Sequence, residues 1–375
     1  MISFKRLLVS GLSCLCLLAG ADDKTAIQNC VEKAIKAGMM LDFNILKGLC
    51  TGDYVKIQEN QKVLDRKLLD NTAIYFERMK DPDLKFSELV ELNFMIRGQK
   101  ITEDKLAHYR KLDSTGRGKA LVQQAQAEIR KTHENLCRTA GELLKTVQYG
   151  PMFLHDDLAV WFYKLDWQVK FKGVIVLRKE NNFWKISREF STLDNAAGGD
   201  QAIADEVRKF MEENERKSRN FSSYTELLAE YSPENVSVMS DGKSMNYAQA
   251  KKLAKFHDSL LYSTPTMVQA APLYIEAYGG KVTPEMLAHF ADQDKSGQGK
   301  QWISKYQEAM KKHREELRNA PDNYTIKHIF LYEDMALIMD SWSLPATGKT
   351  ERVSLIKKHQ GKYLLYRTVS RKALR

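Results

Sequence analysis

Two arginine residues interrupt otherwise apolar faces on two predicted strands. Along a strand, every second side chain points to the same side of the sheet. The alternating residues are Trp184, Ile186, Arg188 and Phe190 near the middle of the chain, and Tyr363, Leu365, Arg367 and Val369 near its end. A buried guanidinium needs a partner, and its planar fork matches a carboxylate or a phosphate. We therefore predict ligand contacts for Arg188 and Arg367, with Trp184 and Tyr363 beside them.

An internal carboxylate is the alternative partner for each arginine. Asp157 and Asp334 stand in corresponding acidic stretches, HDD and YED, directly ahead of predicted strands. A pair between one of these aspartates and the arginine of the same half would make the arginine structural. The sequence leaves ligand binding and internal pairing open.

Histidines recur at corresponding positions, and one of them is spaced from a cysteine as in a metal site. His133 and Cys137 are four residues apart, one helical turn, a spacing that can present two zinc ligands. The corresponding stretch has His313 followed by Leu317. Leucine in place of cysteine indicates a need for apolar volume rather than for a thiolate. We therefore expect no metal.

The stretch DQDKSGQGKQWI begins like a calcium-binding loop. Asp292, Asp294 and Ser296 take its first, third and fifth positions. The twelfth position is Ile303, where a calcium loop requires a bidentate glutamate. The Gly-x-Gly-Lys within this stretch, also present at 116–119, lacks the spacing and the following serine or threonine of a phosphate-binding loop. We expect these glycines to form a corner between two helices.

No set of side chains suited to acid–base catalysis repeats along the chain. Tyr163 and Asp166 lie in a predicted strand, but Asp340 stands opposite Tyr163 in the second half. The sequence therefore leaves the catalytic residues unknown, and we expect no cofactor. An enzyme remains the less favoured alternative.

These residues belong to two copies of one sequence. KITEDKLAHYRKLDSTGRGK at 100–119 returns as KVTPEMLAHFADQDKSGQGK at 281–300, with nine of twenty positions identical and a shift of 181 residues. FLHDDLAV at 153–160 corresponds to FLYEDMAL at 330–337, with a shift of 177. Each copy is about 170 residues long, the size of an ordinary domain. We predict a signal peptide at 1–21, a first domain at 22–191, a linker at 192–202 and a second domain at 203–371.

Each copy places helices before a run of strands. A first amphipathic helix is predicted because apolar residues recur at every fourth position, at Ile27, Val31, Ile35 and Met39. Further helices are expected at 65–79 and 247–262, followed by long helical sections at 84–146 and 266–319. The last third of each copy has the alternation of an antiparallel meander.

Two short polar sequences have the composition of hairpin turns. They are Asn181-Asn182 and Asp241-Gly242, each between apolar stretches. The predicted fold class is α+β. Each of two tandem repeats is expected to contain a curved antiparallel sheet packed with helices, plus an inserted helical hairpin.

This order of elements resembles the nuclear transport factor 2-like superfamily, the cone-shaped fold of SnoaL-like and ketosteroid-isomerase-like proteins. The likeness rests on HDDLA at 155–159 and YEDMA at 332–336, on WKI at 184–186 and YLL at 363–365, and on DGK at 241–243. The resemblance implies one cone in each repeat, with a pocket inside it. Enzymes of the superfamily use an aspartate or histidine base and tyrosine or aspartate donors in that pocket. No position here matches such a set residue by residue.

The first residues have the composition of a secretory signal peptide. Lys and Arg at 5–6 precede an apolar run at 7–18, and Ala-Gly-Ala at 19–21 offers the small residues that signal peptidase requires. A run of about a dozen apolar residues is too short to span a bilayer as a helix. We expect cleavage near Ala21 and a mature protein in the periplasm or outside the cell. A lipid on Cys14 and an uncleaved anchor are the alternatives.

Charge and cysteine content limit the partners and the covalent framework. Cleavage lowers the net charge from +10 to +8, because two basic residues are lost. The remaining basic residues are spread over both halves, so we expect a solvated surface and no nucleic-acid partner. Three cysteines remain, Cys30, Cys50 and Cys137, and the second half has none. Cys30–Cys50 is the most local disulfide that export would permit, but disulfides cannot frame the fold.

The sequence favours an exported, non-catalytic protein of two duplicated domains that binds a small ligand or an envelope component. No transmembrane segment is expected in the mature chain. One alternative is a SnoaL-like enzyme, an isomerase, dehydratase or hydrolase acting on a small apolar substrate. The other is a purely structural tandem. The sequence does not determine the oligomeric state.

Overall fold

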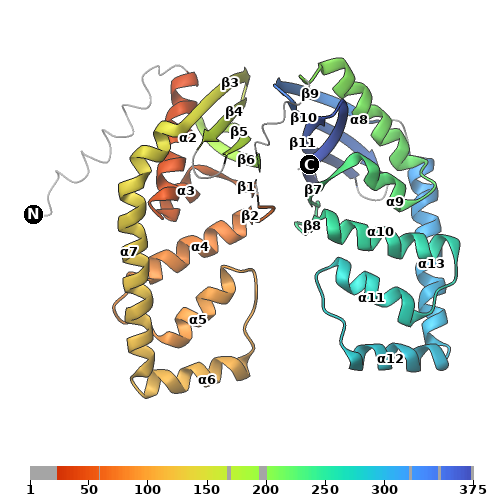
Figure 1. Cartoon of the computed structure of the whole chain (residues 1–375), viewed down its shortest axis with the longest axis horizontal. Coiled ribbons are helices and arrows are strands. Elements are labelled where there is room, and N and C mark those ends of the chain that lie inside the picture. The colour runs from red at the N-terminus through yellow and green to blue at the C-terminus, as the bar shows by residue number, and fades with distance from the viewer. Residues whose placement is uncertain are drawn as a thin grey trace, which may run out of the picture. The chain divides into compact units, whose positions relative to one another are not determined.

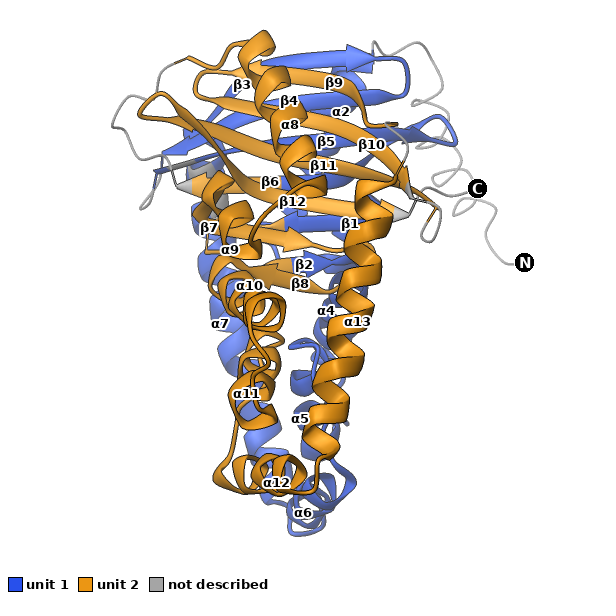
Figure 2. Cartoon of the chain, turned by 90° about the vertical axis from the view of Figure 1, so that its right-hand side faces the viewer, with its two compact units in different colours: residues 1–56, 64–189 blue, residues 57–63, 190–375 orange. Residues whose placement is uncertain are grey.

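The part of the chain that the structure describes contains two six-stranded sheets and a set of helices packed with each sheet (Figure 1). The computed structural model describes residues 23–58, 60–166, 170–193, 201–320, 323–344 and 348–372. The chain divides into two compact units, residues 1–56 with 64–189 and residues 57–63 with 190–375, coloured separately in Figure 2. The predicted signal peptide at 1–21 lies outside the described residues, and so do residues 194–200 of the predicted linker.

The first unit begins with helices and ends with strands. Its helices are α2 (Asp23–Met39), α3 (Phe43–Gly48), α4 (Arg66–Arg78), α5 (Phe86–Met95), α6 (Glu103–Ser114) and α7 (Arg117–Thr146). Its sheet contains β1 (Cys50–Ile57), β2 (Val63–Asp65), β3 (Val147–His155), β4 (Leu158–Asp166), β5 (Lys170–Glu180) and β6 (Phe183–Leu193). The predicted helix at 65–79 corresponds to α4, and the predicted helical section at 84–146 contains α5, α6 and α7.

The second unit repeats this order. Its helices are α8 (Ala204–Arg219), α9 (Tyr224–Leu227), the 3₁₀ helix η1 (Leu228–Glu230), α10 (Tyr247–Tyr262), α11 (Met267–Ala277), α12 (Pro284–Lys295) and α13 (Gln298–Arg318). Its sheet contains β7 (Tyr231–Val238), β8 (Ser244–Asn246), β9 (Thr325–Tyr332), β10 (Met335–Leu344), β11 (Gly348–His359) and β12 (Lys362–Lys372). None of the helices among the described residues combines the length and the apolar character needed to cross a bilayer.

The two sheets have the same strand order, β2-β1-β6-β5-β4-β3 and β8-β7-β12-β11-β10-β9. Strands β9 to β12 pair antiparallel in sequence order, as predicted for the meander. The sheet is mixed rather than wholly antiparallel, because β7 pairs with β12 in parallel. The shared order of helices and strands confirms two tandem repeats of one α+β fold.

The first helix of each unit packs its apolar stripe against a sheet. In α2, Ile27 and Val31 are fully buried and belong to a cluster with Trp161, Leu177 and Ile186 from β4, β5 and β6. Burying an aliphatic side chain of this kind contributes about 1.5–3 kcal/mol relative to exposure. The corresponding cluster in the second unit contains Val207, Met211, Ala336, Ile338, Ile356 and Leu365. The predicted amphipathic helix is therefore present in both copies.

The inserted helices bury apolar side chains in clusters of their own. In the first unit this cluster contains Tyr75, Met79, Leu84, Leu89 and Val122. In the second it contains Phe256, Leu260, Ala270, Ile303 and Met310. Figure 1 places α5 and α6 at the end of the first unit away from its sheet, with α7 running from α6 back to β3.

The repeated Gly-x-Gly-Lys forms a corner between two helices, as predicted. Gly116 joins α6 to α7 with φ of +76°, and Gly297 joins α12 to α13 with φ of +80°. Glycine adopts this left-handed conformation without the steric cost of a β-carbon.

An aspartate beside each corner also caps a second helix. Asp113 accepts the first two backbone amides of α5, at 2.8 and 3.2 Å. Asp294 accepts the first two amides of α11, at 2.8 and 3.1 Å. These amides have no partner within their own helix, so a carboxylate there stabilises the helix start. The sequence stretch that is best preserved between the two copies is therefore a structural corner.

A β-bulge changes which side chains share a face on the last strand. Arg367 pairs with Leu355 and Leu365 with Ile356, so Tyr366 is an extra residue on β12. An extra residue reverses the alternation of side chains. The prediction that Arg367 shares a face with Tyr363 and Leu365 is therefore wrong.

On β6 of the first unit, the alternation of side chains between the two faces of the sheet is also reversed, between Ile186 and Arg188. Trp184 and Ile186 belong to the core cluster of the unit, together with Tyr163. Glu189, rather than Arg188, reaches Tyr163, with its Oε1 accepting the hydroxyl at 3.3 Å. Arg188 therefore lies on the opposite face from Trp184 and Ile186.

Both predicted hairpin turns are present. Asn181 and Asn182, between β5 and β6, have φ of +50° and +66°, and Gly242, between β7 and β8, has φ of +82°. Positive φ at the central turn residues matches the right-handed twist of the flanking strands.

Candidate binding site

Arg188, one of the two predicted ligand-binding arginines, is engaged by its own unit. The residue is 4% exposed, and its Nη2 lies 2.9 Å from Oδ2 of Asp53 on β1. Its Nη1 donates to the backbone carbonyl oxygens of Asp53 and Ser187. The sequence proposed Asp157 as an internal partner. The observed carboxylate is Asp53, because β1 is the strand beside β6 whereas Asp157 lies in the turn between β3 and β4.

Arg367 is fully buried in the second unit. Its Nη1 donates to the carbonyl oxygens of Glu234 and Tyr366. Its Nη2 donates to the carbonyl oxygens of Gln58 and Ser191, at 3.3 and 3.2 Å. Four backbone carbonyl oxygens therefore surround the guanidinium.

Trp184 attaches the first helix of its unit to the sheet. Its Nε1 donates to Oδ1 of Asp23 at 2.9 Å, and Nζ of Lys179 donates to the same oxygen at 2.8 Å. The hydrogen bond from Lys179, followed by that from Trp184, lowers the pKa of the Asp23 carboxyl. Asp23 is the first residue of α2, so this contact fixes the start of the helix.

Tyr363 has the corresponding role in the second unit. Its hydroxyl donates to Oε2 of Glu206 on α8 at 3.0 Å, and Lys358 donates to the same oxygen at 2.8 Å. The hydrogen bond from Lys358, followed by that from Tyr363, lowers the pKa of Glu206. Because the arrangement repeats with different residue types, we interpret it as a structural contact between helix and sheet.

The metal-like sequence patterns are not brought together with further ligands. Cys137 Sγ lies 3.6 Å from Nε2 of His133 on α7. Asp292 forms an exposed ion pair with Lys295 at 3.2 Å. Among the described residues, no group of three histidine, cysteine, aspartate or glutamate side chains is placed to hold a metal ion.

The three cysteines of the described chain are free thiols. Cys30 and Cys50 are buried in the core cluster of the first unit, and Cys137 is exposed. Burial raises the pKa of Cys30 to about 11 and that of Cys50 to about 12. Both core thiols are therefore protonated at neutral pH and poorly nucleophilic.

A carboxylate and a tyrosine meet at the core of the first unit. The hydroxyl of Tyr163 donates to Oε1 of Glu189 at 3.3 Å, and Nζ of Lys56 lies 2.7 Å from the same oxygen. Burial, followed by the nearby Glu189 charge, raises the pKa of Tyr54 well above its ordinary value. Such groups can transfer protons, but here the carboxylate is held by an internal cation.

The second unit has a different set of polar groups in its sheet. Asp340, which stands opposite Tyr163 in the sequence comparison, lies 2.6 Å from Nη2 of Arg352 through its Oδ2. The same oxygen accepts the hydroxyl of Tyr324 at 2.8 Å. The two sheets therefore contain different acidic residues, each paired with a cation of its own unit.

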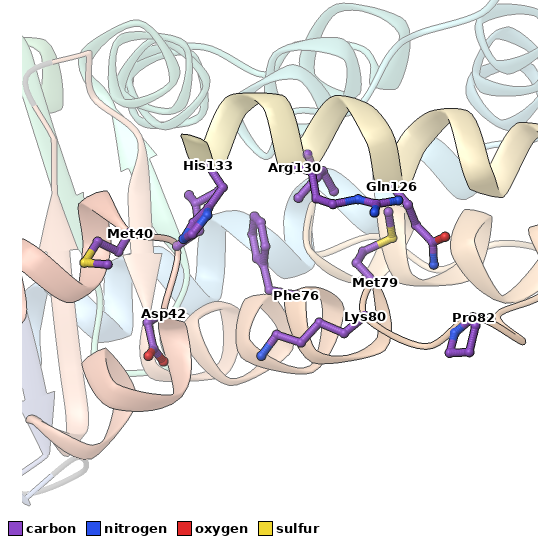
Figure 3. Close-up of a pocket in the computed structure, with 11 residues that line it drawn as sticks. Met40, Asp42, Phe76, Met79, Lys80, Pro82, Gln126, Arg130 and His133 are labelled. Carbon is purple, nitrogen blue, oxygen red and sulfur yellow. The ribbon is translucent and has the colours of Figure 1, made fainter. Parts of the chain in front are cut away.

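A pocket of about 540 Å³ lies outside the sheet core of the first unit, between α7 and the end of α4 (Figure 3). Its lining residues are Met40, Leu41, Asp42, Phe76, Met79, Lys80, Pro82, Gln126, Ile129, Arg130 and His133. The four residues from α7 are three or four positions apart, so they lie on one face of that helix. The volume is within the range of sites for small organic molecules.

Local hydrogen bonds and ring contacts fix the walls of this pocket. Gln126 Nε2 donates to the carbonyl oxygen of Asp81 at 2.8 Å and ties α7 to the turn after α4. Phe76 stacks on Phe43 with ring centres 4.9 Å apart. Asp42 accepts the backbone amide of Ile45 at 3.1 Å and caps α3. The walls are therefore held in place by contacts within the unit.

The charged side chains of the lining differ in their partners. Lys80 pairs with Glu77 at 2.9 Å at the surface. Arg130 is exposed and has no hydrogen-bond or ion-pair partner within the part of the chain that the structure describes. Asp42 directs one carboxylate oxygen to the first turn of α3. The guanidinium of Arg130 is thus the charged group of the pocket that is available to a ligand.

Two positions of the pocket lining carry larger side chains in the second unit. At the shift of 181 residues, Phe221 stands at the position of Met40 and Arg314 at that of His133. The Arg314 guanidinium lies 4.8 Å from the ring centre of Phe221, and its Nη2 donates to the Phe221 carbonyl oxygen at 2.7 Å. Phe221 is 5% exposed. The same location is therefore packed in one copy and hollow in the other.

Aromatic contacts complete the filling in the second unit. Tyr224, at the position of Phe43, lies 4.5 Å from Phe221 and 4.6 Å from His257 between ring centres. Two glutamines at aligned positions fix the register between α7 and α13, that is, which residues of the two helices correspond. Gln126 donates to the carbonyl oxygen of Asp81 just after α4, and Gln307 donates to the carbonyl oxygens of Leu260 and Ser263 at the end of α10. This register places Arg314 opposite His133, so the sequence pairing of His133 with His313 is wrong by one residue.

Sequence reasoning missed most of the pocket. It considered His133 as a metal ligand, rejected that role, and did not single out Phe76, Met79 or Arg130. A usable signal was present where the copies differ at aligned positions, because Met40 is smaller than its counterpart Phe221. A pocket in one copy requires smaller side chains there than at the aligned positions of the other copy.

Comparison with known proteins gives structural matches only. No protein-family model and no curated protein matches the chain. Among solved structures, a nuclear transport factor 2-like protein of unknown function from Shewanella baltica has 9% identity and a TM-score of 0.22, covering 45% of this chain and 91% of its own. A ketosteroid isomerase-like protein from Erwinia carotovora has 9% identity and a TM-score of 0.23, with 47% and 99% covered.

A third match is a nuclear transport factor 2-like protein with a cystatin-like fold from Novosphingobium aromaticivorans. It has 12% identity and a TM-score of 0.23, and covers 52% of this chain and 94% of its own. The resemblance is to the nuclear transport factor 2-like fold. Each match covers about half of the chain, and no activity follows from identities and TM-scores this low.

Proposed function

We propose that this chain is an exported, non-catalytic protein of two duplicated domains, and that its first domain binds a small ligand in the pocket between α4 and α7. The observation that supports this most directly is the difference between the copies. The pocket of about 540 Å³ in the first unit corresponds to a region that Phe221 and Arg314 fill in the second. A hollow with fixed walls and an apolar floor is the usual form of a small-molecule site.

The arrangement of carboxylates inside the units favours binding over catalysis. Glu189 is engaged by Lys56 and Asp340 by Arg352, at 2.7 and 2.6 Å. A carboxylate held by an internal cation takes part in the fold of its own unit, where the two charges balance each other. These paired carboxylates stabilise the sheets, whereas the pocket proposed for the ligand lies apart from them, between α4 and α7.

Export and domain limits are part of the same proposal. Residues 1–21 would be removed as a signal peptide, leaving domains at 22–191 and 203–371 joined by the linker at 192–202. The basic and apolar residues ahead of Ala21 support export. Mass spectrometry of the protein expressed in a bacterium would detect a mature chain that begins near Asp22.

The binding proposal can be tested with N-phenyl-1-naphthylamine, an uncharged probe that fluoresces in apolar surroundings. We expect the mature protein to bind this probe with a saturable signal. The double variant Met40→Phe/His133→Arg, which copies the second unit into the first, should abolish the signal without lowering the melting temperature. Lys131→Arg, an exposed change on the same helix, serves as the control. Absence of saturable binding by the unaltered protein would exclude the pocket as an apolar ligand site.

An enzyme acting on a small apolar substrate is the second candidate. It is supported by the contact between Tyr163 and Glu189 at 3.3 Å, since a tyrosine and a carboxylate can serve as acid and base. Turnover of a substrate that is lost in Glu189→Gln and kept in Met40→Phe/His133→Arg would favour this alternative over the binding protein.

A further inference from the structure

We propose that the pocket of the first unit selects an amphipathic anion, with an apolar chain or ring against the floor and one carboxylate or phosphate head at Arg130. This inference rests on the proposed function, because it assigns the chemical class of the ligand in the same pocket. It goes beyond that function in requiring a negative charge on the ligand and in naming the residue that reads the charge.

The floor of the pocket suits an apolar body. Met79 is 6% exposed and belongs to the apolar cluster of the inserted helices, against which Phe76 and Ile129 also pack. Met40 adds an unbranched side chain that adapts to irregular shapes. A ligand chain lying on these residues would remove apolar surface from water on both sides, which is the main source of affinity in such sites.

The helix α7 supplies the polar groups at the rim. In Figure 3, Arg130 and His133 project from α7, with the ring of Phe76 between them in this view. The two residues are three positions apart and lie on one face of the helix. A guanidinium can grip a carboxylate or a phosphate through two parallel hydrogen bonds, and a histidine ring donates one more in either charge state.

Other charges of the lining are directed to neighbours. Lys80 is paired with Glu77, and Asp42 accepts an amide of α3. Arg130 has no such partner among the residues that the structure describes. An anionic ligand could therefore bind its guanidinium without first breaking an existing ion pair. The second unit has Lys311 at the aligned position, but Phe221 and Arg314 fill the space beside it.

Competition against N-phenyl-1-naphthylamine tests the charge requirement. Decanoate, decyl phosphate and decanol each have ten carbon atoms in an unbranched chain and differ in the head. We expect decanoate, decyl phosphate or both to displace the probe at about 10- to 100-fold lower concentration than decanol, the factor that a charge-assisted hydrogen bond provides. The relative strength of decanoate and decyl phosphate separates a fatty carboxylate from a phosphate ester as the ligand. Inorganic phosphate alone should displace nothing.

Variants identify the residue responsible. Arg130→Met should remove the preference for the anions and leave decanol unchanged, whereas Lys131→Met, which removes the same charge one residue away, should keep the preference. Equal potency of decanol and both anions in the unaltered protein would overturn the anion proposal and leave ligand binding intact. A preference that survives in Arg130→Met would also overturn it. Failure of the neutral probe to bind at all would instead overturn the proposed function.

Discussion

Two buried ionisable residues, one in each unit, are paired with an oppositely charged group of the same unit. Arg188 is paired with Asp53, and Asp340 with Arg352. A buried charge without a partner costs several kcal/mol, about 3–5 where one member of a pair is removed. These residues therefore stabilise the sheets only as pairs, and the sequence could identify Arg188 as buried but not its partner, 135 residues away.

His257 is a partly buried residue of the second unit that should make stability depend on pH. Burial lowers its pKa to about 4, from an ordinary value of 6.5. Below pH 6.5 the unfolded chain binds a proton that the folded chain excludes, so stability decreases as the pH falls towards 4. We expect a loss of about 2 kcal/mol between pH 7.5 and pH 5 from this group, measured by urea unfolding at the two pH values.

The variant His257→Phe provides the matched comparison, because the first unit has Phe76 at the aligned position. It should flatten the pH dependence over this window. Desolvation opposes ionisation of the neighbouring Asp258, but its hydrogen bonds to Thr225 and Ser223 outweigh it and lower its pKa. The contribution of Asp258 is therefore lost at more acidic pH than that of His257. An unchanged loss between pH 7.5 and pH 5 in His257→Phe would show that another group is responsible.

At the scale of elements, the corner between α6 and α7 depends on the absence of a side chain at Gly118. A β-carbon there would lie 2.5 Å from Oδ1 of Asp113 and 3.1 Å from its backbone. Asp113 would then have to move away from the amides that it caps at the start of α5. We expect Gly118→Ala to destabilise the first unit by about 1–2 kcal/mol, the usual cost of a lost helix cap, measured by urea unfolding.

Two variants make this prediction specific. Gly141→Ala lies within α7, where a β-carbon meets no atom within 4 Å, so it should be neutral or stabilise by up to about 1 kcal/mol through helix propensity. In the Asp113→Ala background, Gly118→Ala should cost much less than it does alone. Fully additive effects would mean that the glycine is required for a reason other than the cap.

The corner also shows how far local sequence determines an element. The repeat of D-x-x-G-x-G-K at 113–119 and 294–300 was sufficient to predict a turn between two helices. The cap on α5 and on α11 was not predictable, because each aspartate reaches an amide 26 or 27 residues earlier in the chain. The bulge on β12 was missed because it depends on the pairing with β11 rather than on the composition of β12.

At the scale of the whole molecule, the two units have separate apolar clusters. Leu177 and Ile356 occupy aligned positions in these clusters and are both fully buried. We expect two unfolding transitions, with Leu177→Ala lowering one of them and Ile356→Ala the other, each by about 2–5 kcal/mol. Calorimetry would resolve the transitions. A single transition that moves in both variants would mean that the two units form one cooperative core.

The sequence alone determined the duplication, the order of elements, the hairpin turns and the helix corner. These features follow from periodicity and turn chemistry, which depend on residues near one another in the chain. Only the tertiary structure decided that Arg188 pairs with Asp53 and that the pocket lies between α4 and α7. It also decided that reversed side-chain alternation on the last strand of each sheet turns both arginines away from the aromatic residues of the core. Such features depend on packing between residues distant in sequence, and on the difference in side-chain volume between two copies that share one pattern.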